Sequence, residues 1–428
     1  MLDRSRGARR AGSLFAACLL AGFVSSCRSS APAVETAVLA EDARELLAAG
    51  ETEEARRLTR QWLEREPESA DALSLMGETR VREEAWEEAL TSFEAALASD
   101  PEHVEALYWR VSVLERLERF EEATRAADAY LALVPDDGEM HTTQGLLLDM
   151  LFRSEEAVAS YRRALEHDPW DTDALEMLAF GLYDLDRYEE AAPVLTQWIE
   201  SLPPGSWDER VDAEDARADC WLALGHALEA HDACTALLLQ DPELTAIRFQ
   251  RARALNDLDR KEEALEEYAR VAEEAPDTYM LAYNQGVTLG ELGRFEEAQA
   301  AFERAVREAP DVSWTWGNLG WTLVELQRFE EAEAPLRRSL ELAPENPIAY
   351  TLLGVSHLNR SQPQEALAAF DAALAIEDDF AGNHYNRALA LSELGRTDEV
   401  EAALEACLDL YPTHLGAKQM LAGLRTED

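Results

Sequence analysis

Four side chains that can bind a metal or act as nucleophiles lie within fifteen residues of one another: Cys220, His226, His231 and Cys234. Thiolate and imidazole are the usual ligands of zinc, but zinc sites present tight ligand pairs, and here only His231 and Cys234 share a helix face by spacing. An oxidising compartment permits a bond between Cys220 and Cys234. Cys234 takes a core position that is Phe or Tyr in other parts of the chain, which favours a buried free thiol. This cluster is the basis of a rival hypothesis, an enzyme or a metal-binding protein.

The remaining sequence offers little for catalysis. The other histidines are scattered singly, and there is no phosphate-binding glycine loop, nucleophile elbow or pair of histidines flanking a glutamate. Carboxylates are so abundant that no pair stands out as an acid and a base. We therefore predict a protein that is not an enzyme, with no cofactor and no metal.

The elements that carry these residues repeat with a period of 34 residues. Most copies hold a proline at the same place, namely Pro67, Pro101, Pro135, Pro169, Pro203, Pro242, Pro276, Pro310 and Pro344. Small residues recur twelve and twenty-four residues before each proline. Self-similarity at this period indicates stacked helical hairpins rather than one globular core.

Residues 279–310 show what one copy contains. Apolar residues at three- and four-residue spacing give two amphipathic helices, separated at Gly293. Gly286 on the first helix and Ala298 on the second allow the two backbones to approach closely. Pro310 ends the second helix, because proline has no amide hydrogen and restricts the residue before it.

The connector between the helices is repeated too, as LERFEEA at 117–123, LGRFEEA at 292–298 and LQRFEEA at 326–332. With these signatures the chain resembles the tetratricopeptide repeat (TPR) family over about residues 36–414. Eleven copies start at Thr36, Ala70, Val104, Gly138, Thr172, Val211, Thr245, Tyr279, Ser313, Pro347 and Ala381. The resemblance implies an all-α fold, a right-handed superhelical TPR solenoid of about eleven helix-turn-helix repeats. Repeats 1–5 span 36–205, an inserted loop 206–210, repeats 6–11 span 211–414, and residues 415–428 form a capping helix and tail.

The first 35 residues do not belong to the repeats. Basic residues precede an apolar run from Ala11 to Val24, which is too short to span a bilayer. The sequence Val24-Ser25-Ser26-Cys27 resembles the bacterial lipobox, which implies a signal peptide at 1–26, a lipidated Cys27 and a tether at 27–35. A plain secretory peptide is the alternative. Because Arg28 follows the cysteine instead of the Asp associated with inner-membrane retention, we expect an anchor in the outer membrane, facing the periplasm.

The net charge of −47 restricts the partners. A strongly acidic body repels nucleic acid and anionic lipid, so we expect no nucleic acid and contact with membrane through the lipid anchor only. Basic protein or peptide segments are attracted to such a body. Solubility is an equally good explanation of the acidic excess, since glutamate suits exposed helix positions. The sequence leaves the oligomeric state open.

In TPR proteins the first helix of each hairpin lines a concave groove, and this resemblance directs attention to six positions of each copy. The second position is acidic in the first half of the chain, at Asp71, Glu105, Glu139, Asp173 and Asp212. In the second half, apolar, aromatic and amide residues replace the carboxylates. Amides can pair with any peptide backbone, and aromatic residues supply buried area. We predict peptide contacts from Phe249, Gln250, Arg253, Met280, Tyr283, Asn284, Trp314, Asn318, Trp321 and Asn386.

The leading hypothesis is a non-catalytic scaffold or adaptor, anchored by its lipidated cysteine and binding protein segments in envelope assembly or secretion. In plan it resembles TPR lipoproteins that assist the assembly of envelope structures. Besides the enzyme or metal-binding hypothesis, a passive structural spacer without a ligand is the remaining alternative. Both an extended and a helical ligand are compatible with helical repeats.

Overall fold

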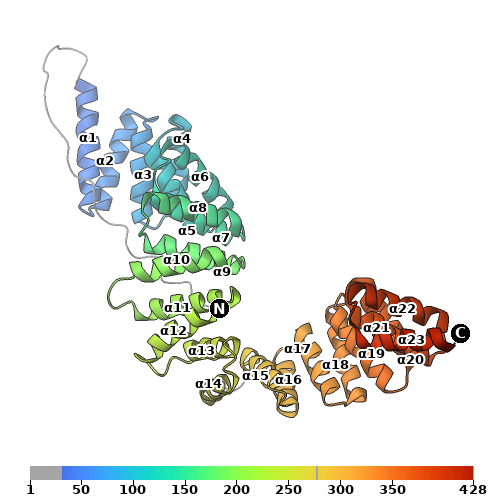
Figure 1. The fold of residues 1–428 in the computed structure, drawn as a ribbon. Coiled ribbons are helices and arrows are strands. Elements are labelled where there is room, and N and C mark those ends of the chain that lie inside the picture. The colour runs from blue at the N-terminus through green and yellow to red at the C-terminus, as the bar shows by residue number, and fades with distance from the viewer. Residues whose placement is uncertain (1–30, 276–277, 428) are drawn as a thin grey trace. The chain divides into compact units, whose positions relative to one another are not determined.

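The computed structural model describes residues 31–275 and 278–427 (Figure 1). This part of the chain contains twenty-three helices and no strand. The predicted signal peptide and Cys27 lie outside the described residues. The chain divides into two compact units, with the boundary between Arg153 and Ser154.

In the first unit, α1 to α7 follow one another through short turns. Their bounds are α1 Ala31–Ala48, α2 Thr52–Arg65, α3 Ala70–Arg82, α4 Trp86–Ser99, α5 Val104–Arg116, α6 Phe120–Leu133 and α7 Gly138–Met150.

The second unit contains α8 to α23. Their bounds are α8 Ser154–His167, α9 Thr172–Asp184, α10 Tyr188–Ser201, α11 Trp207–Ala223, α12 Ala227–Leu238, α13 Thr245–Asp257, α14 Lys261–Glu274, α15 Tyr279–Glu291, α16 Phe295–Glu308, α17 Ser313–Glu325, α18 Phe329–Leu342, α19 Pro347–Asn359, α20 Pro363–Ile376, α21 Ala381–Glu393, α22 Thr397–Leu410 and α23 Leu415–Glu427.

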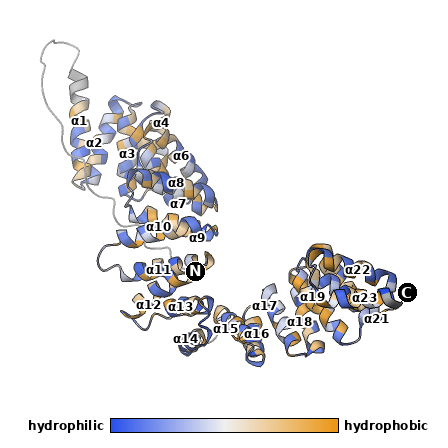
Figure 2. Ribbon diagram, viewed as in Figure 1, coloured by the Kyte–Doolittle hydropathy of each residue, from blue (hydrophilic) through white to orange (hydrophobic). Residues whose placement is uncertain are grey.

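In several hairpins, a large residue of the second helix packs against a small residue of the first. The ring of Phe302 on α16 is fully buried, and a Cβ at Gly286 on α15 would lie 2.7 Å from that ring. Gly354 and Phe370 repeat this contact between α19 and α20. Hydrophobic and hydrophilic residues are mixed along the helices, as the packing of amphipathic helices requires (Figure 2). The predicted all-α repeat fold is confirmed.

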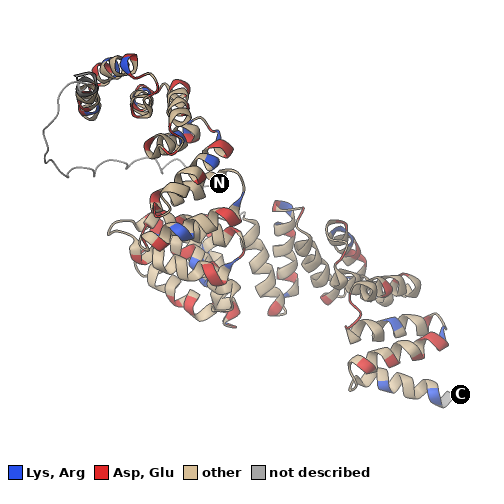
Figure 3. Cartoon of the chain, turned by 90° about the horizontal axis from the view of Figure 1, so that it is seen from above, with Lys and Arg blue, Asp and Glu red and all other residues tan. Residues whose placement is uncertain are grey.

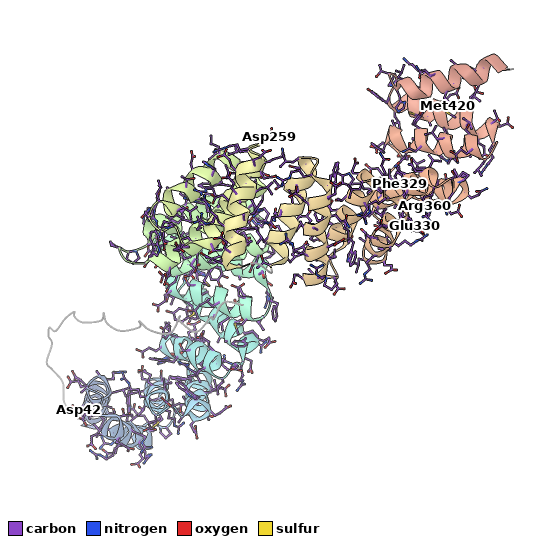
Figure 4. The ribbon with its side chains drawn as sticks, turned by 90° about the horizontal axis from the view of Figure 1, so that it is seen from below. Asp42, Asp259, Phe329, Glu330, Arg360 and Met420 are labelled. Carbon is purple, nitrogen blue, oxygen red and sulfur yellow. The ribbon has the colours of Figure 1, made fainter. Side chains whose placement is uncertain are left out.

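One residue with a positive φ turns the chain within each hairpin. Glycine takes this place in four turns, among them Gly293 with φ of 71°. Polar residues take it in most others, such as Asp259 between α13 and α14 (φ 59°, Figure 4). Phe152, between α7 and α8, is the exception, a bulky residue at φ 58° with 94% of its surface exposed. The connector therefore depends on the left-handed conformation more than on residue type.

Neighbouring hairpins are joined by side-chain bonds to backbone and by ion pairs. Phe329, Glu330 and Arg360 lie together where α18 begins and α19 ends (Figure 4). Ser356 donates to the carbonyl oxygen of Phe329 at 2.6 Å, and Arg360 Nη1 lies 2.6 Å from Glu333 Oε2. The last helix, α23, covers the end of the stack with Ala417 and Leu421 buried.

The structure corrects the predicted loop at 206–210. Only residues 202–206 are irregular, and α11 begins at Trp207, so four of the five inserted residues extend the helix. Asp208 and Glu209 stabilise the first turn by facing the positive end of the helix dipole. Trp207 packs against the core of the α11–α12 hairpin. At the other end, α1 begins at Ala31, inside the segment predicted as a tether.

Candidate ligand-binding surface

The second half of the second unit presents one face of α15, α17 and α19, which we call the first-helix face. It carries Met280 and Asn284 from α15, Trp314 and Asn318 from α17, and Ile348 from α19. Met280, Trp314 and Ile348 are 47%, 58% and 68% exposed. These three large apolar side chains are therefore available to a partner.

Hydrogen bonds between neighbouring helices hold the aromatic residues of this face in place. Trp314 Nε1 donates to the hydroxyl of Tyr279 at 2.8 Å, and that hydroxyl lies 3.0 Å from Thr315 Oγ1. Asn318 Nδ2 donates to the hydroxyl of Tyr283 at 3.3 Å. The rings of Tyr279 and Tyr283 lie 5.9 Å apart. The surface is thus organised before any ligand arrives, which lowers the entropy lost on binding.

Trp321 has a different role from Trp314. Its ring meets Phe295 edge-on with the centroids 5.7 Å apart, and a Cβ at Gly290 would lie 2.7 Å from it. Trp321 therefore joins α17 to the preceding hairpin, and only part of its surface is accessible. Helical spacing alone places both tryptophans on one face and does not reveal this neighbour.

The predicted binding residues on α13 contact one another and residues of neighbouring helices. Arg253 forms an ion pair with Asp219 on α11 and donates to Gln250 Oε1 at 2.8 Å. Asp219 also accepts from the hydroxyl of Tyr183 on α9. Gln250 is 7% exposed. Phe249 packs against Tyr268 with ring centroids 5.9 Å apart. This part of the predicted surface stabilises the stack of helices and leaves little free for a ligand.

Asn386 stands apart from the other amides. It lies on α21, is half-buried, and makes no hydrogen bond through its side chain within the described chain. On the intervening helix α19, Leu352 takes the amide position and packs into the core.

Buried charge is concentrated beside this region, in α11 to α14. Glu267 is 6% exposed and lies 3.1 Å from Arg248 Nη1 and 2.8 Å from Arg251 Nη2. Burial raises the pKa of Asp215 above its usual range, with a smaller contribution from Asp219, while a hydrogen bond from Gln250 acts in the other direction. The Oδ1 atom of Asp215 is buried and lacks a hydrogen-bond partner.

The Cys/His cluster does not form a site. Cys220 and Cys234 are separate, buried free thiols, and burial raises the pKa of each to about 12. His231 Nδ1 lies 3.0 Å from Asp232 Oδ1, and its Nε2 lies 3.4 Å from Arg260 Nη1. Among the residues that the structure describes, no group of three or more His, Cys, Asp or Glu side chains is arranged to hold a metal ion.

Carboxylates are spread over both units and greatly outnumber basic residues (Figure 3). On α3 in the first unit, burial raises the pKa of Glu78 to about 7, with a further contribution from Glu105 on α5. A carboxyl group with this pKa titrates close to neutral pH. Across residues 31–275 and 278–427, no helix has the length and apolar character needed to cross a bilayer.

Similarity to solved structures is broad and distant. Naa15/Naa10 bound to HypK-THB is 16% identical over 92% of this chain and 66% of that one, with a TM-score of 0.48. YrrB, described as a TPR protein with an unusual peptide-binding site, is 23% identical over 44% of this chain and 98% of its own, with a TM-score of 0.41. MamA from Desulfovibrio magneticus RS-1 is 24% identical over 39% and 94%, with a TM-score of 0.36. No curated protein matches the chain.

Sequence models of the tetratricopeptide repeat match most of the region that the 34-residue period covers. The matched segments are 74–138, 144–206, 277–345, 318–383 and 381–414. They agree with the hairpins seen in the structure and with the glycine–aromatic contacts inside them. The chain therefore belongs to the tetratricopeptide repeat family.

Proposed function

We propose that this protein is a non-catalytic scaffold that binds protein or peptide segments on the first-helix face of α15, α17 and α19. The exposed Trp314, held by its hydrogen bond to Tyr279, is the observation that carries the proposal. A large aromatic side chain that is both exposed and fixed loses little entropy on binding and buries much apolar area. The same arrangement explains why α17 keeps an otherwise unfavourable exposed ring.

The setting of the scaffold is a second part of the proposal. The lipobox-like Val24-Ser25-Ser26-Cys27 supports lipidation of Cys27 and an anchor in the bacterial outer membrane facing the periplasm. Such a place suits a role in envelope assembly or secretion. The net charge of −47 favours basic protein segments over nucleic acid.

Site-specific photo-crosslinking in cells tests the binding face. A photoreactive phenylalanine derivative replaces Trp314 in one strain and Leu239, which is 82% exposed between α12 and α13, in a second. We expect discrete adducts from position 314 and none from position 239. Equal adducts from both positions, or none from either, would contradict the assignment; the second result would favour a passive spacer.

A matched pair of variants separates this face from the rest of the surface. Trp314→Ala removes an anchor, while Trp170→Ala removes a tryptophan of similar exposure, 55%, from the turn between α8 and α9. We expect recovery of the crosslinked partner to fall at least tenfold in the first variant and to stay unchanged in the second. Mass spectrometry of the mature amino terminus, with Cys27→Ser as control, tests the lipid anchor independently.

A further inference from the structure

Four consecutive hairpins, from α15–α16 to α21–α22, each present one large exposed apolar side chain on or just before their first helix, and three of these side chains belong to the first-helix face. These residues, which we call the apolar row, are Met280, Trp314, Ile348 and Phe380. Phe380 is 54% exposed and precedes α21. Gly382 takes the position on α21 that corresponds to Met280, Trp314 and Ile348 but has no side chain. The ring of Phe380 fills this place, since a Cβ at Gly382 would lie 2.7 Å from it. In α9 and α11 of the same unit the equivalent position holds Asp173 and Asp212.

The spacing of the apolar row restricts the conformation of a guest chain. The helices that carry it are in contact, α15 with α17, α17 with α19 and α19 with α21. Packed helices lie about 8–10 Å apart, so the anchors repeat at about that distance. A polyproline II chain advances about 9.3 Å in three residues and presents the same side again. A β-strand does so after about 6.7 Å, which does not match the row. An α-helix does so after about 5.4 Å, so that its residues seven apart, two turns along, lie about 10.5 Å from each other and also match the row.

Amide side chains beside the apolar row distinguish the two conformations that fit. Asn284 Nδ2 donates to the carbonyl oxygen of Met280 at 2.8 Å, and Asn318 Nδ2 donates to Tyr283. The Oδ1 atoms of both residues have no donor within the described chain and can accept from a guest. A polyproline II backbone has amide groups without internal partners, whereas those of a helix are already bonded. The amides therefore favour the extended guest.

Carboxylates flank the apolar row. Asp311, Glu345 and Asp379 are exposed in the turns that precede α17, α19 and α21. Asp311 lies 3.4 Å from Arg338, but Glu345 and Asp379 have no basic partner in the part of the chain that the structure describes. A guest with cationic side chains between its apolar ones would be electrostatically complementary to this surface.

Resting on the proposed function, we infer that the guest is a polyproline II segment with a large apolar residue at every third position and Lys or Arg among the intervening residues. Four anchors correspond to a segment of about twelve residues.

Two peptides of identical composition test the period. One is a labelled twelve-residue peptide with four copies of Leu-Pro-Arg, and its isomer places the four leucines together. Because charge and composition are equal, electrostatic adsorption is the same for both. We expect the full-length protein to bind the periodic peptide at least tenfold more tightly by fluorescence anisotropy. Equal affinities would overturn the inference, and so would tighter binding of a basic helical peptide with leucines seven residues apart.

Variants then locate the periodic peptide on the protein. We expect Trp314→Ala with Ile348→Ala to weaken its binding at least tenfold, and Glu345→Gln with Asp379→Asn to weaken it severalfold and reduce its dependence on salt. Trp170→Ala should leave the affinity unchanged. Circular dichroism checks that each variant is folded, and the comparison of the two peptides uses the unaltered protein. Unchanged affinity in both double variants would overturn the placement on the apolar row.

A selection from random peptides separates this inference from the proposed function. Enriched peptides with apolar residues at a period of three support both. Enriched peptides without that period, still dependent on Trp314, overturn the inference and leave the proposed function standing. No enrichment, together with no crosslinks from position 314, overturns both.

Discussion

The hairpins α11–α14 and α15–α18 share one backbone plan but differ in what fills it. In α15–α18 the helix contacts are apolar: Phe302 lies over Gly286, and Leu336 lies over Gly320. In α11–α14 the same core positions hold Cys234 and Tyr268, and ion pairs between largely buried side chains lie beside them. Arg217 pairs with Glu214 and lies 4.4 Å from the centroid of the Trp221 ring. A TPR hairpin thus needs small and large residues at a few sites and tolerates charge beside them.

The outward faces of the two regions differ in the same sense. On α11 and α13, the ion pair of Asp219 and Arg253 occupies positions that correspond to the first-helix face of the later hairpins. On α15 and α17, the corresponding surface carries the exposed apolar side chains of Met280 and Trp314. The first region therefore holds these positions in contacts between helices, whereas the second exposes Met280 and Trp314, on which the proposed binding face rests. The following experiments test that division, starting with the largest expected effect.

Phe302→Ala should destabilise the α15–α16 hairpin more than any other change considered. The ring is fully buried, and deletion of a buried phenylalanine side chain costs about 3–5 kcal/mol. Cys234→Ala, at the equivalent site of α12, removes one sulfur atom and should cost about 1 kcal/mol. Hydrogen exchange resolved along the chain measures both. Equal effects at the two sites would show that the two cores are energetically alike.

Glu267→Gln should destabilise α13–α14 by about 2–3 kcal/mol, because it leaves the partly buried guanidinium groups of Arg248 and Arg251 without this charged acceptor. Glu303→Gln on α16 is the matched control and should have little effect, since among the described residues its carboxylate accepts only from Gln299. Chemical denaturation measures the free energy of unfolding of both variants. An unchanged free energy of unfolding in Glu267→Gln would mean that the ion pairs of Glu267 contribute nothing to stability.

Asp215→Asn should stabilise the protein at neutral pH by about 1 kcal/mol, because it removes a buried carboxylate whose Oδ1 has no partner. Burial raises the pKa of Asp215 in the folded state above its usual 3.8. The folded protein therefore holds this proton more tightly than the unfolded chain. The resulting stability is complete below pH 3.8 and is lost as the pH rises through the folded pKa.

The pH dependence of the variant provides the check. The difference in unfolding free energy between Asp215→Asn and the unaltered protein should grow with pH from below 4 and then become constant. A difference that does not depend on pH would mean that Asp215 has the same pKa in both states.

The smallest effect is expected at the repeated connector. Arg260 pairs with Glu263 and Arg294 pairs with Glu297, both at 2.7 Å or less, at the surface of the two regions. Exposed ion pairs three residues apart are weak and are screened by salt. We expect Arg260→Gln and Arg294→Gln to leave the midpoint of denaturation unchanged within error. A clear shift in only one of them would show that the connectors of the two regions are not equivalent.

The sequence was sufficient for the fold because the residues that define it act within one hairpin. Gly286 and Ala298 predict a close helix pair from local spacing alone, and the start of the last helix at Leu415 follows from the same period. The extension of α11 to Trp207 was missed, since Pro203-Pro204-Gly205 suggests a loop and the contribution of Asp208 and Glu209 to a helix start depends on where the preceding turn ends.

The ligand surface could be predicted only in part, because exposure depends on neighbouring hairpins. Trp314 and Trp321 occupy similar sites by spacing, yet the glycine at 290 provides a place for the second ring and none exists for the first. Gln250 fits an amide series by its position, but it is buried and accepts from Arg253 on its own helix, which pairs with Asp219 on α11. These contacts cross from one copy to another and are not encoded by the period.

The apolar row has one consequence for the length of what the protein can hold. Residues 313–346 form one complete copy of 34 residues, which contributes Trp314 to the row. Their deletion would make the copy with Ile348 follow directly on the copy with Met280 and would keep the remaining turns intact. The shortened protein would keep three of the four anchors. The peptide that it binds most tightly should therefore be three residues shorter, neither two nor four.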